Sequence, residues 1–115
     1  MESKRKELTR QYKDRKITGG IYLIKNSLGG KSVLGSTTDI QGSRNRFDFS
    51  RKTGMCADKR IEDEWKRLGA DAFSFDVLEE IAKGAAQTDR EFERDLADYK
   101  KLWLEKLSGD GEIIA

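Results

Sequence analysis

Two short β-rich segments separated by a glycine-containing turn constrain the fold of this chain most strongly. The first, residues 19–25, contains Gly20-Ile21-Tyr22, and the second, residues 31–35, ends in Val33-Leu34-Gly35. Residues 26–30, Asn-Ser-Leu-Gly-Gly, supply the turn residues between them. The pattern predicts a β-hairpin with a tyrosine in its first strand.

Three later segments combine helical apolar spacing with residues typical of helix ends. The first follows Ser36-Thr37-Thr38-Asp39 and runs to about residue 52, the second runs from about residue 58 to Gly69, and the third opens on Thr88-Asp89-Arg90-Glu91 and runs to Leu107. Between the second and third, Phe73, Phe75 and Val77 alternate with polar residues. That alternation predicts a third strand over residues 73–79.

The predicted element order, β-β-α-α-β-α, indicates an α+β domain with a small three-stranded sheet, antiparallel or mixed, packed by helices. In the charged segment of residues 2–16, Leu8 and Tyr12 are four apart, which predicts an additional N-terminal helix. We therefore divide the chain into an N-terminal helical extension, residues 1–18, and one domain, residues 19–115.

The composition restricts both the class of protein and its chemistry. With 115 residues, of which 36% are hydrophobic and 38% charged, the chain is long enough for one modest core. We expect no membrane association and a cytoplasmic location, because the sequence has neither a long apolar run nor an apolar N-terminal stretch. The chain has no histidine and a single cysteine. Any chemistry must therefore use tyrosine, lysine, arginine and carboxylates.

Charge is distributed unevenly along the chain. Residues 1–60 hold 15 Lys and Arg against 6 Asp and Glu, a balance of +9, whereas residues 61–115 hold 8 against 15, a balance of −7. A basic half is typical of a surface that binds a polyanion. The same distribution also fits a solvated dipolar protein with no nucleic-acid partner.

Three ordered blocks of this sequence resemble the GIY-YIG nuclease family. They are Gly20 to Asn26, then Leu68-Gly69 with residues 73–81, and finally Trp103-Leu104. The resemblance implies a GIY-YIG-like fold over most of the chain. It also implies a site that cleaves phosphodiester bonds with a metal ion, Mg²⁺ or Mn²⁺, and a tyrosine on each strand of the hairpin.

The resemblance assigns Tyr22 to the first of these tyrosines, which activates or orients water near the phosphate. A phenol with a pKa near 10 is a poor base at neutral pH, so it needs a nearby cation or metal ion. Strand parity makes Lys31 the expected neighbour of Tyr22. Val33 takes the place of the second tyrosine and provides no hydroxyl.

The family also has an arginine in its first helix, and this sequence offers two candidates. An ungapped placement puts Ser43 at that position, whereas an insertion of one residue puts Arg44 there. We prefer Arg44 because a guanidinium binds phosphate through two hydrogen bonds. Arg46 remains the alternative, and both are candidate nucleic-acid-binding residues.

The metal site departs furthest from the family pattern. Lys100 stands three residues before Trp103, where the family has a glutamate, and Ile113 stands in place of an asparagine. A lysine at that position repels a divalent cation, which needs oxygen ligands. An ammonium there can instead bind a phosphate together with Lys31, Arg44 and Arg46.

Three functions remain open from the sequence. The first is a nuclease-like protein with a degenerate active site that binds nucleic-acid phosphates, with DNA as the expected partner, and has weak or lost hydrolysis. The second is an active, divergent, Mg²⁺-dependent DNA endonuclease. The third is a non-catalytic protein-interaction domain. The sequence leaves the oligomeric state undetermined.

Overall fold

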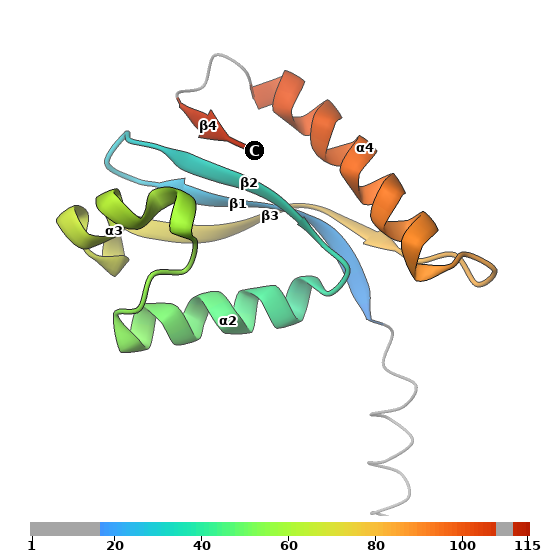
Figure 1. Ribbon diagram of the computed structural model, residues 1–115, viewed down its shortest axis with the longest axis horizontal. Helices are drawn as coiled ribbons and strands as arrows, with labels where there is room; N and C mark the ends of the chain where they lie inside the picture. Colours follow the sequence, from blue (N-terminus) through green and yellow to red (C-terminus); the bar gives the residue numbers. More distant parts are fainter. Residues whose placement is uncertain (1–16, 108–111) are drawn as a thin grey trace, which may run out of the picture.

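One four-stranded sheet and three helices make up the described part of the protein (Figure 1). The computed structural model describes residues 17–107 and 112–115, so the helix expected within residues 2–16 lies outside the described residues. The strands are β1 (Thr18–Asn26), β2 (Ser32–Thr37), β3 (Phe73–Ala82) and β4 (Ile113–Ile114). The helices are α2 (Ile40–Thr53), α3 (Glu62–Leu68) and α4 (Asp89–Leu107).

The sheet is mixed, with the strand order β3-β1-β2-β4. Strand β1 pairs antiparallel with both β2 and β3, and β2 pairs parallel with β4. The predicted hairpin, third strand and α+β class are confirmed. Strand β4 is an addition to the three predicted strands, because a two-residue strand has no periodicity that a sequence can display.

The two faces of the sheet bury different sets of side chains, as the two-residue period of a strand requires. Ile24 and Val33 pack toward α2 and α3, against Phe47 and Trp65. On the other face, Ile21, Leu23 and Leu34 form a second cluster with α4 side chains including Trp103 and Leu104. Figure 1 shows α4 on the opposite side of the sheet from α2 and α3.

The helices begin and end at capping residues. Asp39 caps α2 by accepting a hydrogen bond from the Gly42 N–H at 3.0 Å, and Gly54 ends the helix with a φ of 78°. Asp58 caps a 3₁₀ turn, Lys59–Ile61, which leads directly into α3. None of the described helices is both long and apolar enough to cross a membrane.

Glycines of the hairpin permit two close approaches within the sheet. A Cβ at Gly20 would collide with the backbone carbonyl of Glu79 in β3. A Cβ at Gly35 would collide with the phenol end of Tyr22, its three nearest atoms being Tyr22 Cζ, Oη and, at 2.8 Å, Cε2. Gly35 therefore leaves the space that the Tyr22 ring occupies.

Candidate functional site

The Tyr22 side chain lies across the hairpin on the face that α2 and α3 cover. Tyr22 pairs with Gly35 in β2, and its ring stacks on Phe75 of β3 with centroids 4.9 Å apart. Burial raises the pKa of the Tyr22 phenol, the Asp58 carboxylate raises it further, and Arg60 and Arg46 lower it. The balance is upward, so at neutral pH the phenol is protonated and is a hydrogen-bond donor.

Arg46 is held beside Tyr22 by hydroxyl groups at the start of α2. Its Nη2 donates to Ser43 Oγ at 3.0 Å, and the Ser43 hydroxyl in turn donates to Thr37 Oγ1 at 2.8 Å. This chain of hydrogen bonds links α2 to the end of β2. It fixes one nitrogen of the guanidinium, and the Arg46 and Tyr22 side chains line the same cavity.

Asp58 and Arg60 form a bidentate ion pair next to the same phenol. Arg60 Nε donates to Asp58 Oδ1 at 2.9 Å, and Nη2 donates to Oδ2 at 2.8 Å. The pair lowers the pKa of Asp58 and raises that of Arg60, chiefly through these hydrogen bonds. Both oxygens of the carboxylate are therefore engaged by one guanidinium.

Lys100, on helix α4, interacts electrostatically with this ion pair although α4 packs on the other face of the sheet. Partial burial lowers the pKa of the Lys100 ammonium, Arg60 lowers it further, and Asp58 raises it. Lys100 also contributes to the lowered pKa of Asp58. The ammonium therefore lies within electrostatic range of both members of the pair.

These five side chains come from four parts of the fold, and we call them the Tyr22 site: Tyr22 from β1, Arg46 from α2, Asp58 and Arg60 from the 3₁₀ turn, and Lys100 from α4. The site holds three cations and one carboxylate, a formal charge of +2. Beside it a cavity of about 210 Å³ opens against α2. Residues lining that cavity include Tyr22, Ser43, Arg46, Phe47, Ser50, Asp58 and Phe75.

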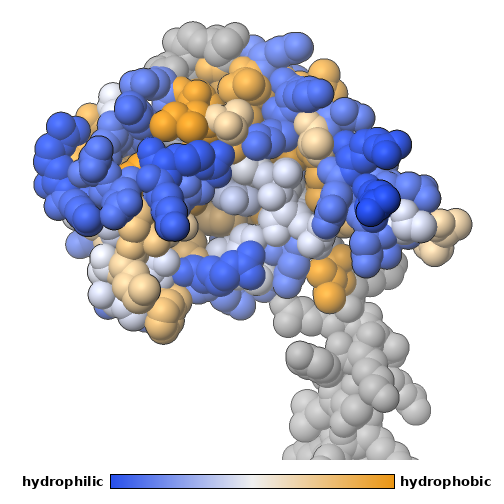
Figure 2. Space-filling view, viewed as in Figure 1, coloured by the Kyte–Doolittle hydropathy of each residue, from blue (hydrophilic) through white to orange (hydrophobic). Residues whose placement is uncertain are grey.

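The surface between α2 and α4 is polar. Figure 2 shows a weakly polar area over the middle of β2, flanked by strongly hydrophilic groups. Arg46 and Arg60 are exposed, so the Tyr22 site is accessible to a charged ligand.

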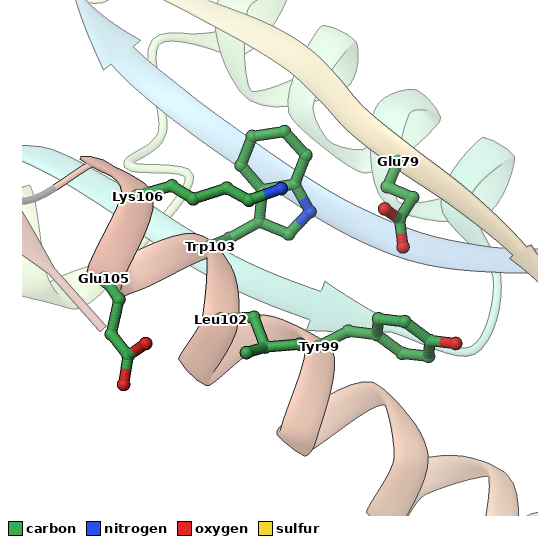
Figure 3. Close-up of a pocket in the computed structure, with 6 residues that line it drawn as sticks. All are labelled: Glu79, Tyr99, Leu102, Trp103, Glu105 and Lys106. Atoms are coloured by element: carbon green, nitrogen blue, oxygen red, sulfur yellow. The ribbon is translucent and has the colours of Figure 1, made fainter.

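A second hollow, of about 460 Å³, lies between α4 and β3 (Figure 3). Its wall includes the Trp103 ring, over which the Lys106 ammonium lies 4.9 Å from the ring centroid. Glu79 and Glu105 also line this hollow. This hollow has one cation, Lys106, against two carboxylates, whereas the Tyr22 site has three cations against one carboxylate, so the Tyr22 site is the better candidate for an anionic ligand.

Comparisons with known proteins give structural matches only. No protein-family model matches the chain, and no curated protein matches its sequence. The fold matches that of a point mutant of the catalytic domain of the intron endonuclease I-TevI, with a TM-score of 0.59 and 24% identity over 86% of this chain and 95% of that one. A second structure, the catalytic domain of the homing endonuclease I-TevI, matches with a TM-score of 0.54 and 27% identity, over 84% and 98% of the two chains.

The chain has a GIY-YIG-like fold. The hairpin that carries Gly20-Ile21-Tyr22 is therefore the structural hairpin of that fold, as the sequence resemblance implied.

Within this GIY-YIG-like fold, three of the predicted site residues, Tyr22, Arg46 and Lys100, lie in the Tyr22 site. The preferred arginine, Arg44, places its guanidinium 5.8 Å from the centroid of the Phe75 ring, which itself stacks on Tyr22. Lys31 stands next to the hairpin turn, four residues from Gly35, which corresponds to about 13 Å along a strand. The structure thus places Arg46 in the same cavity as Tyr22 and Arg44 over the neighbouring ring, and it separates Lys31 from Tyr22.

Val33 and Ile113 contribute to the core and to the strand pairing of the GIY-YIG-like fold. Val33 is fully buried in the cluster below Phe47 and Trp65. Ile113 pairs with Ser32 in the parallel β2–β4 ladder. Neither side chain offers a polar group to a ligand.

Sequence reasoning missed Asp58 and Arg60. It identified Asp58 only as the place where a helix begins. An acid at a capping position with an arginine two residues later was a signal for a local ion pair. That this ion pair lies beside Tyr22 depends on how the turn packs against the sheet, which the spacing does not show.

The carboxylates of the site do not fit a Mg²⁺ or Mn²⁺ ion. Among residues 17–107 and 112–115, no group of three or more acidic or cysteine side chains is placed to hold a metal ion. Asp58 is the acidic member of the Tyr22 site, and Arg60 engages both of its oxygens. A divalent ion would have to displace Arg60 and tolerate Lys100 and Arg46 nearby.

Proposed function

We propose that this GIY-YIG-like protein binds nucleic-acid phosphates at the Tyr22 site and has lost metal-dependent phosphodiester hydrolysis. The observation that carries the proposal is that Arg46 and Arg60 lie beside one phenol and that Lys100 lies near the Asp58–Arg60 pair, so that three cations gather around a single carboxylate. The matched solved structures are described as endonuclease catalytic domains, which supports a nucleic-acid partner, and DNA in particular.

Each group has a defined role in binding. Arg46 uses one nitrogen to hold Ser43, which leaves its other N–H groups for a phosphate oxygen. Lys100 supplies a point charge that is already partly desolvated, and the protonated phenol of Tyr22 donates a further hydrogen bond. Binding is then dominated by charge-assisted hydrogen bonds to the backbone of the nucleic acid.

The same features disfavour hydrolysis. A general base must accept a proton near neutral pH, whereas the pKa of Tyr22 is raised above its ordinary value of 10.0. The Asp58 carboxylate, with its lowered pKa and its ion pair, is a weak base as well. A phosphate in this site is therefore held without an activated water molecule.

Binding is tested by fluorescence anisotropy with a labelled DNA duplex across a series of salt concentrations. We expect Arg46→Ala and Lys100→Ala each to weaken binding for all sequences and to reduce the slope of log K against log salt by about 0.9. Lys101→Ala is the matched control, because it removes an exposed lysine adjacent to Lys100 on α4. Equal effects of Lys100→Ala and Lys101→Ala would remove the case for a specific site.

Hydrolysis is tested by nicking of a supercoiled plasmid in Mg²⁺ and in Mn²⁺, with Tyr22→Phe as the control. We expect no nicking above background from either protein. Nicking by the parent that Tyr22→Phe abolishes would contradict the proposed loss of hydrolysis and establish the active endonuclease instead. If the protein neither nicks nor binds DNA at low salt, a protein-interaction domain is the remaining function of the three.

A further inference from the structure

Strand β3 forms one edge of the sheet and leaves its outer side open to another strand. It pairs with β1 and, among the strands that the structure describes, with no other. Its ten residues, Phe73–Ala82, make it the longest of these strands, yet Phe73 is its one buried residue, whereas most of the neighbouring strand β1 is buried. Such an edge has a row of backbone N–H and C=O groups that can pair with a strand of another protein.

The edge has little protection against such pairing except negative charge. Proteins commonly protect an edge strand with lysine, proline or a bulge. Strand β3 contains neither lysine nor proline, and its bulge is limited to Leu78, which has no partner in the β1 register. Its charged residues are Asp76, Glu79 and Glu80, all of them acidic. These carboxylates favour a strand that carries positive charge.

The two faces of β3 differ in polarity. Asp76 pairs with Leu23 and Glu79 pairs with Ile21, and both of these partners lie in the apolar cluster under α4. Directly paired residues of neighbouring strands project to the same face, so both carboxylates are on the α4 face. The Phe75 ring packs on the opposite cluster, near α2 and α3. A strand added beside β3 therefore meets carboxylates on one face and an apolar ring on the other.

The hollow between α4 and β3 extends the acidic face with apolar side chains. Figure 3 shows Glu79 of β3 across this hollow from Tyr99, Leu102 and Trp103 of α4. Leu102 is 54% exposed and Tyr99 is 39% exposed. The alkyl stem of a lysine or arginine can pack on these two side chains while its cation reaches the Glu79 carboxylate. The Lys106 ammonium, 4.9 Å from the centroid of the Trp103 ring, shows that a cation fits against this wall.

Charge also distinguishes between the strands that could occupy the edge. The β3 strand of a second copy would bring three further carboxylates and no cation, and like charges on paired strands are destabilising. Residues 61–115, which include β3 and α4, hold 8 Lys and Arg against 15 Asp and Glu. A basic partner is therefore favoured over a second copy of this chain.

We propose that the outer edge of β3 and the hollow beside it bind an extended, basic segment of a partner protein, which adds a strand to the sheet. Basic residues of that segment lie toward Asp76 and Glu79, and the apolar residues that alternate with them lie beside Phe75. The inference is independent of the proposed phosphate binding, because the hollow is on the opposite face of the sheet from Tyr22.

The probe is a labelled peptide in which lysine and valine alternate, and its control has the same composition with the lysines in one block and the valines in another. Binding to the full chain is measured by fluorescence anisotropy at about 0.15 M salt, where long-range attraction is largely screened. We expect the alternating peptide to bind roughly tenfold more tightly than the block peptide, because alternation places all lysines on one face of a strand. Amide hydrogen exchange of residues 73–82 should slow in the complex, because the outer backbone groups gain partners.

Variants of the two faces test the orientation of the bound segment. Glu79→Gln should weaken binding of the alternating peptide roughly two- to fivefold, as expected for a partly exposed ion pair. Glu80→Gln is the matched control, because Glu80 pairs with Gly20 and its side chain is on the opposite face; it should change the affinity little. Lys106→Gln should tighten binding, since it removes a competing cation from the hollow. Arg46→Ala should leave peptide binding unchanged.

Four results would overturn the inference. Equal binding of the two peptides, or equal effects of Glu79→Gln and Glu80→Gln, would indicate general attraction to an acidic surface. Binding without slower exchange in β3 would exclude strand addition. A dimer in sedimentation equilibrium that the alternating peptide dissociates would identify a second copy as the occupant. No binding of the alternating peptide would refute the docking surface and leave phosphate binding, which the DNA titrations test separately.

Discussion

Gly35→Ala is expected to destabilise the protein through one contact, that with the Tyr22 ring. The backbone of Gly35 has no positive φ, so alanine fits the strand conformation. Its Cβ would, however, lie closer than 3 Å to three atoms of Tyr22, and Phe75 stacks on that ring at 4.9 Å. Overpacking of this kind costs about 1–3 kcal/mol.

A double-mutant cycle tests whether the loss of stability caused by Gly35→Ala comes from the contact with Tyr22. Alanine is intrinsically better than glycine in a strand by about 0.5–1 kcal/mol. In the Tyr22→Ala background, where the ring is absent, Gly35→Ala should therefore be neutral or slightly stabilising. The coupling free energy between the two positions should be at least about 1 kcal/mol.

Urea unfolding followed by tryptophan fluorescence measures all four corners of the cycle. Gly84→Ala is the control, because a Cβ there would meet its nearest neighbour, Gln87 Cβ, at an ordinary 3.5 Å, and we expect a change within about 0.5 kcal/mol. An equal loss of stability from Gly35→Ala with and without the Tyr22 ring would refute the reasoning, since the collision would then involve other atoms.

Three further perturbations test other parts of the structure. Val33→Tyr should lower the free energy of unfolding by about 1–3 kcal/mol and add no metal affinity, because Val33 is fully buried in the core; Mn²⁺ titration calorimetry that detects new binding would contradict this. The pKa of Asp58 is lowered by its hydrogen bond to Arg60, so the stability from this pair is present above the ordinary Asp pKa and is lost as the pH falls through the lowered one. Asp58→Asn should therefore reduce the loss of stability below about pH 4, measured by urea unfolding, and an unchanged acid profile would argue against the pair. Lys106→Ala should cost about 0.5–1 kcal/mol and alter Trp103 fluorescence, since the ammonium lies over the ring, whereas Lys101→Ala should do neither.

The hairpin illustrates what local sequence can establish. Alternating side chains and a Gly-Gly turn are properties of consecutive residues, so β1 and β2 were predicted close to their observed bounds. The same holds for the start of helix α4, where the Glu91 N–H donates to Thr88 Oγ1 at 3.1 Å and the Thr88 hydroxyl donates to Glu91 Oε1 at 3.1 Å. Strand β3 extends three residues beyond its predicted end at Glu79, because Thr18 of β1 pairs with Ala82.

Only part of the site could be predicted from local sequence. Arg44 and Arg46 are both arginines and lie two residues apart on one helix. Which of them faces the site depends on the rotation of α2 about its axis relative to the sheet. Packing of Phe47 into the core sets that rotation. It directs Arg46 to the Ser43 hydroxyl, in the cavity that Tyr22 also lines, and it places Arg44 over Phe75.

The sequence by itself determined the class of fold, the hairpin with Tyr22, and the absence of histidine chemistry, because these follow from the order and identity of neighbouring residues. Only the tertiary structure decided which charges surround the phenol and the ion pair beside it. Asp58, Arg60 and Lys100 are 36 or more residues from Tyr22 in the chain, and α4 approaches the site from the opposite side of the sheet. Their meeting depends on how helices and turns pack against both faces of the sheet, which no local pattern encodes.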